Sequence, residues 1–331
     1  MNIKLATTLV SVGMLSLAAA RVASAQIVKI DGSSTVFPIT EAVAEEYQIQ
    51  KRGKVRVTVG ISGTGGGFKR FCRGETDVSD ASRPILAGEM ASCAAAGIKY
   101  IELPIAYDAL TLVVNPKATW VDQVTVAELK KMWEPAAQGV VTKWQQVNSK
   151  WPNAPLKLFG PGADSGTFDY FTETVNGKAK SSRGDFTASE DDNILVQGIE
   201  ADVNGLAYFG YAYYAAQQGK MKALKVVNAT GVAVGPSAAA VLDGSYNPFS
   251  RPLFIYVNAQ SAQRPEVKEF VEFYLSEGAQ YIKEVKYVPF SAAAYQTALG
   301  HFRNKKLGTV FGGTPQVGLK VEDLLSREAK L

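Results

Sequence analysis

Short apolar runs in this sequence alternate with helical patterns, and the junctions between them are rich in glycine, serine and threonine. The runs at 27–30, 55–61 and 156–159 predict strands, and helices are predicted from about residues 38, 68 and 168 onward. This alternation predicts an α/β fold, because each strand pairs with others while the helix that follows packs across the sheet. With 331 residues, the chain is long enough for two such units.

Two longer apolar runs, Ile101 to Val114 and Pro252 to Val257, are predicted to be strands that pass between the two units. The sequence thus predicts a two-lobed α/β protein in which each lobe is a mixed sheet flanked by helices. Lobe 1 would comprise residues 26–105 and 256–331, and lobe 2 residues 106–255. Because the chain crosses twice, the two crossing strands would form a hinge on which rigid lobes can close.

The first 25 residues have the features of a cleavable export signal. Lys4 precedes an apolar stretch that ends near Ala20, and Ala23-Ser24-Ala25 is the small-x-small pattern that signal peptidases cut. A membrane anchor is the alternative, but the apolar run is short for a span and Arg21 lies at its end. We therefore expect an exported protein whose mature chain begins at Gln26.

Cys72 and Cys93 are the only cysteines in the sequence. Export would place both in an oxidising compartment. A disulfide at this spacing would stabilise the fold by about 3 kcal/mol through the entropy of the unfolded chain. We predict a structural disulfide, and two reduced, buried cysteines are the alternative if the chain is not exported.

Composition argues against several classes of function. The formal net charge of +4 is too small for a nucleic-acid track. His301 is the only histidine, which argues against Ser-His-Asp hydrolysis and against histidine-built metal sites. The glycine-rich segment at 63–68 lacks the complete pattern of a nucleotide-binding loop. We therefore expect neither an enzyme nor a cofactor, although a secreted phosphatase with Ser165 as nucleophile remains the alternative.

Four loops rich in glycine, serine and threonine lie at the ends of predicted strands, and at least three of them open a helix. A helix N-terminus presents unpaired backbone N–H groups and the positive end of the helix dipole, and glycine lets the backbone approach a ligand closely. Each loop alone has an ordinary explanation, since serine and threonine cap helices and glycine forms turns. Together the four loops predict a site for a small anion. The hydroxyl donors would be Ser34, Thr35, Thr64, Ser82, Ser165 and Thr167, and Arg83 is a cation within these loops.

Two further polar segments receive a separate interpretation. The consecutive acids at 190–192 precede an apolar helix and are interpreted as its N-terminal cap region rather than as a metal site. Arg183 is left as a further candidate contact to a bound anion.

The four loop segments, in this order and at this spacing, resemble those of the periplasmic phosphate-binding proteins of the phosphate ABC transporter. This is the PstS family, and the resemblance is greatest to its SphX-type branch. It covers nearly all of the mature chain and rests on DGSSTVFP at 31–38, GTGGGF at 63–68, SDASRP at 79–84 and ADSGTF at 163–168. It implies a two-lobed, type II-like periplasmic binding protein that is a monomer in the periplasm. Such a protein binds inorganic phosphate without a cofactor and delivers it to a membrane-embedded ABC permease.

The resemblance also implies which residues bind phosphate, with two departures from the family pattern. Many relatives have an arginine a few residues before their Ser-Gly-Thr, whereas residues 160–162 here are Gly-Pro-Gly, so that Arg83 is assigned the cationic role. Some relatives have an aspartate where Ser82 stands, and it accepts the phosphate proton; here Asp80 or Asp164 would have to substitute. The implied site comprises Ser34, Thr35, Thr64, Gly65, Ser82, Arg83, Asp164, Ser165, Gly166 and Thr167.

The acceptor carboxylate decides which anion is selected. Protonated phosphate has an O–H group to donate, whereas sulfate at neutral pH has none and is repelled by a buried carboxylate. A site with donors only would not discriminate, so binding of sulfate or another oxyanion is the alternative function.

Overall fold

The computed structural model describes residues 26–314, 324 and 326–327. The predicted export signal at 1–25, and residues 315–323, 325 and 328–331 of predicted lobe 1, lie outside the described residues. None of the described helices combines the length and the apolar character needed to cross a membrane. The α-helices are α1 Phe37–Gln50, α2 Gly63–Phe71, α3 Ala87–Ala95, α4 Val126–Trp133, α5 Trp144–Val147, α6 Gly166–Asn176, α7 Asp192–Ala201, α8 Tyr211–Ala216, α9 Ala238–Leu242, α10 Pro265–Glu284 and α11 Ala292–Arg303.

Most of the described strands belong to one mixed sheet, and the rest form a small three-stranded sheet in the order β11-β10-β5. The larger sheet has the order β2-β1-β3-β12-β4-β8-β6-β7, and β9 and β13 also pair with β4. The strands are β1 Gln26–Gly32, β2 Val55–Ile61, β3 Val78–Ala81, β4 Tyr100–Val114, β5 Gln123–Thr125, β6 Lys157–Pro161, β7 Thr187–Ser189, β8 Gly205–Gly210, β9 Lys222–Ala223, β10 Lys225–Val227, β11 Ala233–Val234, β12 Ser250–Asn258 and β13 Val288–Pro289.

Strand directions divide the large sheet into two parallel parts joined by antiparallel pairs. β1 is parallel to β2 and β3, and β6 is parallel to β7 and β8. Between these parts, β12 is antiparallel to β3 and β4, and β4 is antiparallel to β8. Parallel strands connected through helices confirm the α/β character that the sequence predicts.

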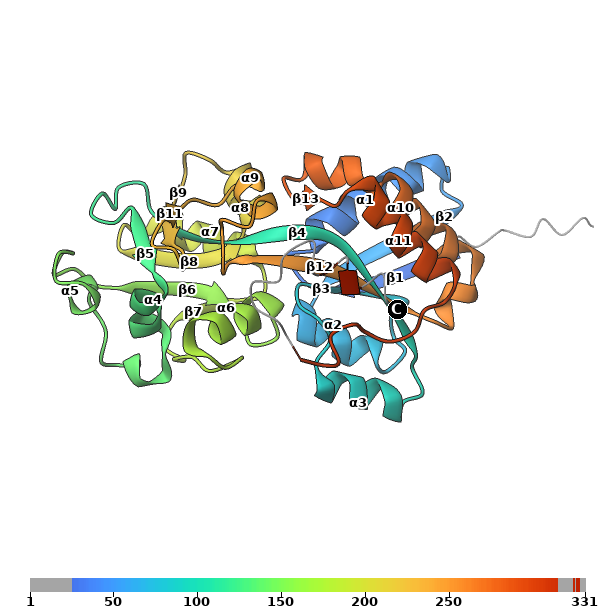
Figure 1. Cartoon of the computed structure of the whole chain (residues 1–331), viewed down its shortest axis with the longest axis horizontal. Helices are drawn as coiled ribbons and strands as arrows, with labels where there is room; N and C mark the ends of the chain where they lie inside the picture. The colour runs from blue at the N-terminus through green and yellow to red at the C-terminus, as the bar shows by residue number, and fades with distance from the viewer. Residues whose placement is uncertain (1–25, 315–323, 325, 328–331) are drawn as a thin grey trace, which may run out of the picture.

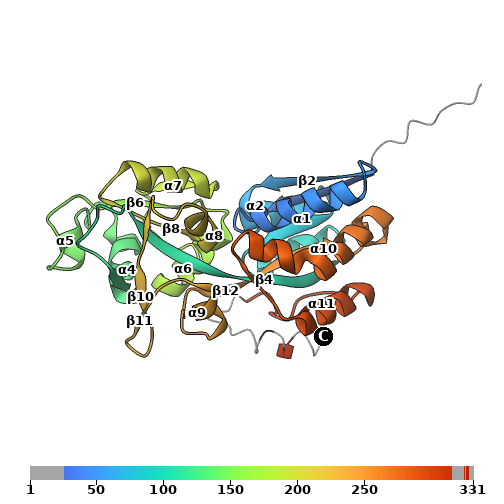
Figure 2. The same ribbon diagram turned by 90° about the horizontal axis from the view of Figure 1, so that it is seen from above.

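The two long strands β4 and β12 connect two groups of elements (Figure 1). The first group contains β1–β3 with α1–α3, α10 and α11, and the second contains β5–β11 with α4–α9 (Figure 2). β4 pairs with β12 from Tyr100 to Ala109 and with β8 from Leu110 to Val114. Every residue of both long strands is buried, so the strands that connect the groups also belong to the core.

The second helix begins earlier than the sequence predicts. We expected a glycine-rich loop before a helix at 68–73, but α2 starts at Gly63 and includes the whole glycine run. A Cβ atom on Gly67 would lie 2.6 Å from the Cα atom of Gly32 in β1. Glycine therefore lets the first turns of α2 lie directly against the strand, and this close approach, rather than a loop conformation, explains the composition.

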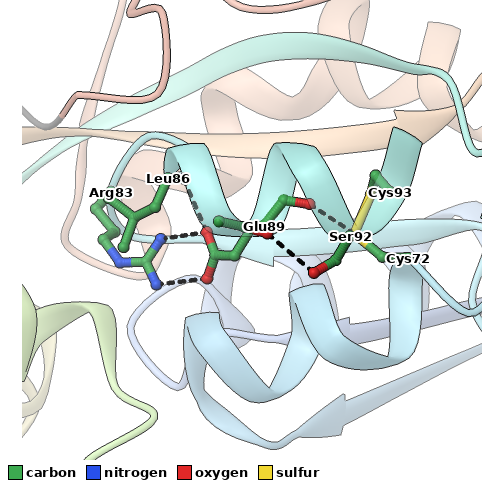
Figure 3. Close-up of a disulfide and its surroundings, with 7 residues drawn as sticks. Cys72, Arg83, Leu86, Glu89, Ser92 and Cys93 are labelled. Atoms are coloured by element: carbon green, nitrogen blue, oxygen red, sulfur yellow. Dashed lines mark hydrogen bonds and ion pairs between the residues drawn. A yellow bond between two sulfur atoms is a disulfide. The ribbon is translucent and has the colours of Figure 1, made fainter. Parts of the chain in front are cut away.

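The predicted disulfide is present and joins Cys72, at the end of α2, to Cys93 in α3 (Figure 3). Cys93 is fully buried and Cys72 nearly so. The bond therefore fixes α3 against α2, close to the loop that contains Arg83.

Candidate functional site

The N-termini of α2 and α6 meet although they come from different groups of elements. The N–H of Gly65 donates to the carbonyl of Asp164 at 2.8 Å. A Cβ atom on Gly166 would lie 2.5 Å from Thr64 Oγ1 and 2.6 Å from Ser82 Oγ. Gly166 thus lets the start of α6 press against the second and third predicted loops.

Hydroxyl groups from all four predicted loops are buried around this contact. The Thr64 and Ser82 hydroxyls share a hydrogen bond of 3.1 Å, and the N–H of Ser82 donates to Thr64 Oγ1 at the same distance. The hydroxyls of Thr35 and Thr167 form a second pair at 3.0 Å, which joins the first loop to the start of α6. The structure therefore brings together hydroxyls that lie up to 132 residues apart in the sequence.

Arg251 of β12 is buried beside this second pair, and the sequence analysis did not identify it. Its Nη2 donates to Thr167 Oγ1 at 2.7 Å and to Thr35 Oγ1 at 3.3 Å. Its Nη1 donates to the Gly166 carbonyl at 3.2 Å. Asp108 of β4 pairs with the guanidinium at 3.1 Å and keeps it in place. A fully buried cation thus lies against the hydroxyls at the start of α6.

Burial and the charge of Arg251 shift the pKa of Asp108 in opposite directions. Burial raises the pKa of Asp108 to about 6, whereas Arg251 lowers it. Although it is paired with Asp108, the buried Arg251 guanidinium also donates to the Thr35 and Thr167 hydroxyls. A buried guanidinium beside hydroxyl groups is suited to binding an anion.

Arg83, the predicted cationic ligand, is held by carboxylates. Its Nε donates to Asp169 Oδ2 at 2.7 Å. Figure 3 shows its other two nitrogens, Nη1 and Nη2, which donate to the two Glu89 oxygens at 2.9 and 2.8 Å. Nη1 also donates to the carbonyl of Pro84. Because Asp169 belongs to α6, Arg83 links the first group of elements to the second.

Neither predicted acceptor carboxylate is hydrogen-bonded to the hydroxyl cluster, since both Asp80 oxygens are buried without a partner and Asp164 binds Lys69. Burial raises the pKa of Asp80 well above its usual value, and the nearby Thr40 hydroxyl lowers it. Thr40 belongs to α1 and shares a hydrogen bond with Tyr274 of α10, so these neighbours of Asp80 lie within the first group. Asp164 forms an ion pair with Lys69 at 2.7 Å, and its side chain is 37% exposed.

The remaining predicted residues have local roles. Ser165 Oγ accepts the N–H of Thr167 and caps α6. The carbonyl of Ser34 accepts the Tyr213 hydroxyl at 2.8 Å, which joins the first loop to α8. The guanidinium of Arg183 donates to Asp185 and to two carbonyls, and none of these partners belongs to the hydroxyl cluster.

Fold and site together define a class. Two parallel α/β parts joined through long antiparallel strands, with helix N-termini and a buried arginine meeting between them, define a solute-binding protein for a small anion. The chain matches the model of the PBP superfamily domain over residues 18–278.

Comparison with known proteins identifies the family. Protein SphX of Synechococcus elongatus is 55% identical over 309 residues, which cover 92% of this chain and 90% of that protein. The phosphate-binding protein PstS of Staphylococcus saprophyticus is 37% identical over 271 residues, covering 81% of this chain and 82% of the relative. A solved putative phosphate ABC transporter substrate-binding protein with bound phosphate, from Clostridium perfringens, is 26% identical with a TM-score of 0.66. That match covers 80% of this chain and 100% of the other. This chain belongs to the SphX/PstS family of periplasmic-binding-protein fold.

Proposed function

We propose that this protein binds inorganic phosphate at the hydroxyl cluster and delivers it to an ABC-type phosphate permease. The observation that carries the proposal is the meeting of the α2 and α6 N-termini with the buried guanidinium of Arg251. Helix N-termini, hydroxyls and a guanidinium all favour a small dianion. Two relatives support this choice, since one is named a phosphate-binding protein and another was solved with phosphate bound.

The proposed ligand set follows from the residues that meet. Backbone N–H groups at the start of α6 that lack an acceptor would donate to the anion, whereas the Thr167 N–H already donates to Ser165 Oγ. Arg251 would supply the positive charge of the site. Arg83, to which the sequence assigns this role, forms ion pairs with Glu89 and Asp169 instead. The proposed contacts are Ser34, Thr35, Thr64, Gly65, Ser82, Ser165, Gly166, Thr167 and Arg251.

The two groups of elements would act as two lobes that close on the anion. The proposed boundaries are residues 26–105 plus 256–331 for lobe 1 and residues 106–255 for lobe 2. One feature supports a hinge there: the β12–β4 register shifts between Leu253 and Phe254, opposite Pro104 and Ala106. An irregular pair within two long strands is a position at which the chain can bend.

The proposed setting is the periplasm, where a monomeric mature chain starting at Gln26 would meet a membrane-embedded permease. Micromolar or tighter capture requires about −8 kcal/mol, which charge-assisted hydrogen bonds in a closed, dry site can supply. No step of this function requires a cofactor.

A thermal-shift and calorimetry panel on residues 26–331 tests the proposal. Phosphate and arsenate should raise the melting temperature, with a phosphate Kd of about 1 μM or below, because ligand bound only to the native state stabilises it. Sulfate should bind much more weakly. Equal or tighter binding of sulfate would assign the site to another oxyanion, and turnover of a chromogenic phosphoester would assign it to a phosphatase.

A further inference from the structure

Asp192 is a buried carboxylate with no hydrogen-bond partner at either oxygen. It is the first residue of α7 and is fully buried. The preceding residue, Asp191, performs the capping role that the acidic run predicts, because its side chain accepts the N–H of Asn193. Asp192 is therefore left without the structural role that the sequence assigns to this segment.

The charged neighbours of Asp192 belong to the proposed site. Burial raises the pKa of Asp192 to about 8, and the charge of Arg251 lowers it. The charges of Asp108, Asp191 and Glu190 raise it further. Burial raises the pKa of three tyrosines, Tyr208, Tyr213 and Tyr287, and the charge of Asp192 is among the further causes that raise each of them.

Two of these tyrosines are bound to the first loop of the site. Tyr213 donates to the carbonyl of Ser34 at 2.8 Å, and Tyr287 donates to the carbonyl of Thr35 at 2.5 Å. The charge of Asp192 therefore acts on two tyrosines that hold the first loop, and the charge of Arg251, which donates to the hydroxyl cluster, acts on Asp192. Asp80 is also buried with both oxygens unpartnered, but the groups that act on it, Thr40 of α1 and Asp31 of β1, belong to the first group of elements. Asp164 instead pairs with the exposed Lys69.

A buried carboxylate without donors is costly, and a ligand that carries a proton removes that cost. Hydrogen phosphate has one O–H to donate. Sulfate has none, so in its presence the carboxylate must either face another anion or first take up a proton from water.

We propose that Asp192 accepts the hydrogen bond of protonated phosphate and is the residue that discriminates against sulfate. This inference rests on the proposed function and deepens it. Asp192 replaces both carboxylates that the family resemblance left open, and it places the selecting group at the N-terminus of α7 in the second group of elements.

Asp192→Asn tests the role, with Asp191→Asn as the matched control. Loss of a negative charge favours both dianions, so the readout is the ratio of the sulfate Kd to the phosphate Kd rather than either value. This ratio should fall by about 100-fold in Asp192→Asn, because the amide can donate to sulfate. In Asp191→Asn the ratio should be unchanged, since asparagine also caps helices. Asp192→Ala serves as the second variant if the amide disturbs folding.

A measurement on the unaltered chain gives independent information. The ratio of the sulfate Kd to the phosphate Kd is taken with the phosphate Kd expressed for the dianion. This ratio should rise as pH increases from 6 to 9, because only the protonated Asp192 carboxyl can donate to sulfate. A ratio that does not change with pH, or that Asp192→Asn and Asp192→Ala leave intact, overturns the inference while phosphate binding itself stands. If the unaltered chain does not bind phosphate, the proposed function fails instead.

Discussion

Arg83 of the loop after β3 and Asp169 of α6 form a hydrogen-bonded ion pair of 2.7 Å, and both side chains are 2% exposed. The pair crosses from one group of elements to the other. Glu89 of α3 binds the remaining nitrogens of Arg83. Arg83 therefore pairs with one carboxylate in its own group of elements and with one in the other group. This geometry favours a role in holding the two groups of elements together.

Replacing Arg83 by Met should therefore act first on stability. Removing one partner of a buried ion pair leaves an uncompensated charge, which costs about 3–5 kcal/mol. The nearest other cation to Asp169 is Lys180, at 4.0 Å and half exposed. Urea unfolding of Arg83→Met, Asp169→Asn and the double variant should show that the two changes are strongly non-additive. Loss of phosphate binding in Arg83→Met with unchanged stability would instead make Arg83 a direct ligand.

Arg251→Gln should weaken phosphate binding by about 100-fold or more, because a buried charge-assisted contact to the anion is lost. Asp108 would remain buried without its cation, so its pKa should rise above about 6 and the carboxyl should protonate at neutral pH. Calorimetry measures the affinity. Arg303→Gln, which changes a mostly exposed arginine paired with Glu272, serves as the charge-matched control. Equal affinities in both variants would remove Arg251 from the site.

Gly166→Ala should disrupt the contact between the start of α6 and the Thr64 and Ser82 hydroxyls by steric clash alone. The new methyl group would lie within 2.6 Å of the Thr64 and Ser82 hydroxyls, which is too close for a real contact. Phosphate affinity should fall more than the free energy of unfolding without ligand, because the clash is confined to the contact between the α6 start and the Thr64 and Ser82 hydroxyls. Gly300→Ala in α11 has nothing within 4 Å and should raise stability by about 0.5–1 kcal/mol without changing affinity. Identical affinities for the two variants would show that the α6 start does not approach the ligand.

Glu102 should make stability depend on pH. Burial raises its pKa to about 7, although hydrogen bonds from Thr309, Tyr256 and the N–H of Val310 lower it. Its unfolded value is about 4.3, so the native state holds more protons between these values and the free energy of unfolding falls as pH rises through them. Relative to Glu102→Gln, the unaltered chain should lose up to about 3 kcal/mol between pH 5 and pH 8. Urea unfolding at both pH values measures the difference in the free energy of unfolding between the two chains. If this difference is the same at pH 5 and pH 8, the raised pKa of Glu102 is contradicted.

The elements of the fold were predictable because their signals are local. The alternation of strand and helix, the long apolar runs and the paired cysteines each lie within short stretches of sequence. The start of α2 was not predictable, because the glycines at 63–67 have the composition of a loop. Only the packing of Gly67 on Gly32 shows why they form a helix.

The site was predictable only in part. The four loops were identified because helix N-termini have a recognisable composition, and three of them bring Thr35, Thr64 and Thr167 close together. Arg251 was missed because it lies in an apolar strand and its partners are 84 to 216 residues away. Asp192 was not identified because it lies in an acidic run, and the sequence explains that run by the helix cap that Asp191 provides. Such contacts depend on tertiary packing, which a single sequence does not display.

A crystal structure of residues 26–331 grown with phosphate tests the central claim most directly. The anion should lie between the α2 and α6 N-termini, with its oxygens in hydrogen-bond distance of Thr64, Thr167 and Arg251. A phosphate bound at one group of elements only, or at a position remote from the start of α6, would contradict the proposed site.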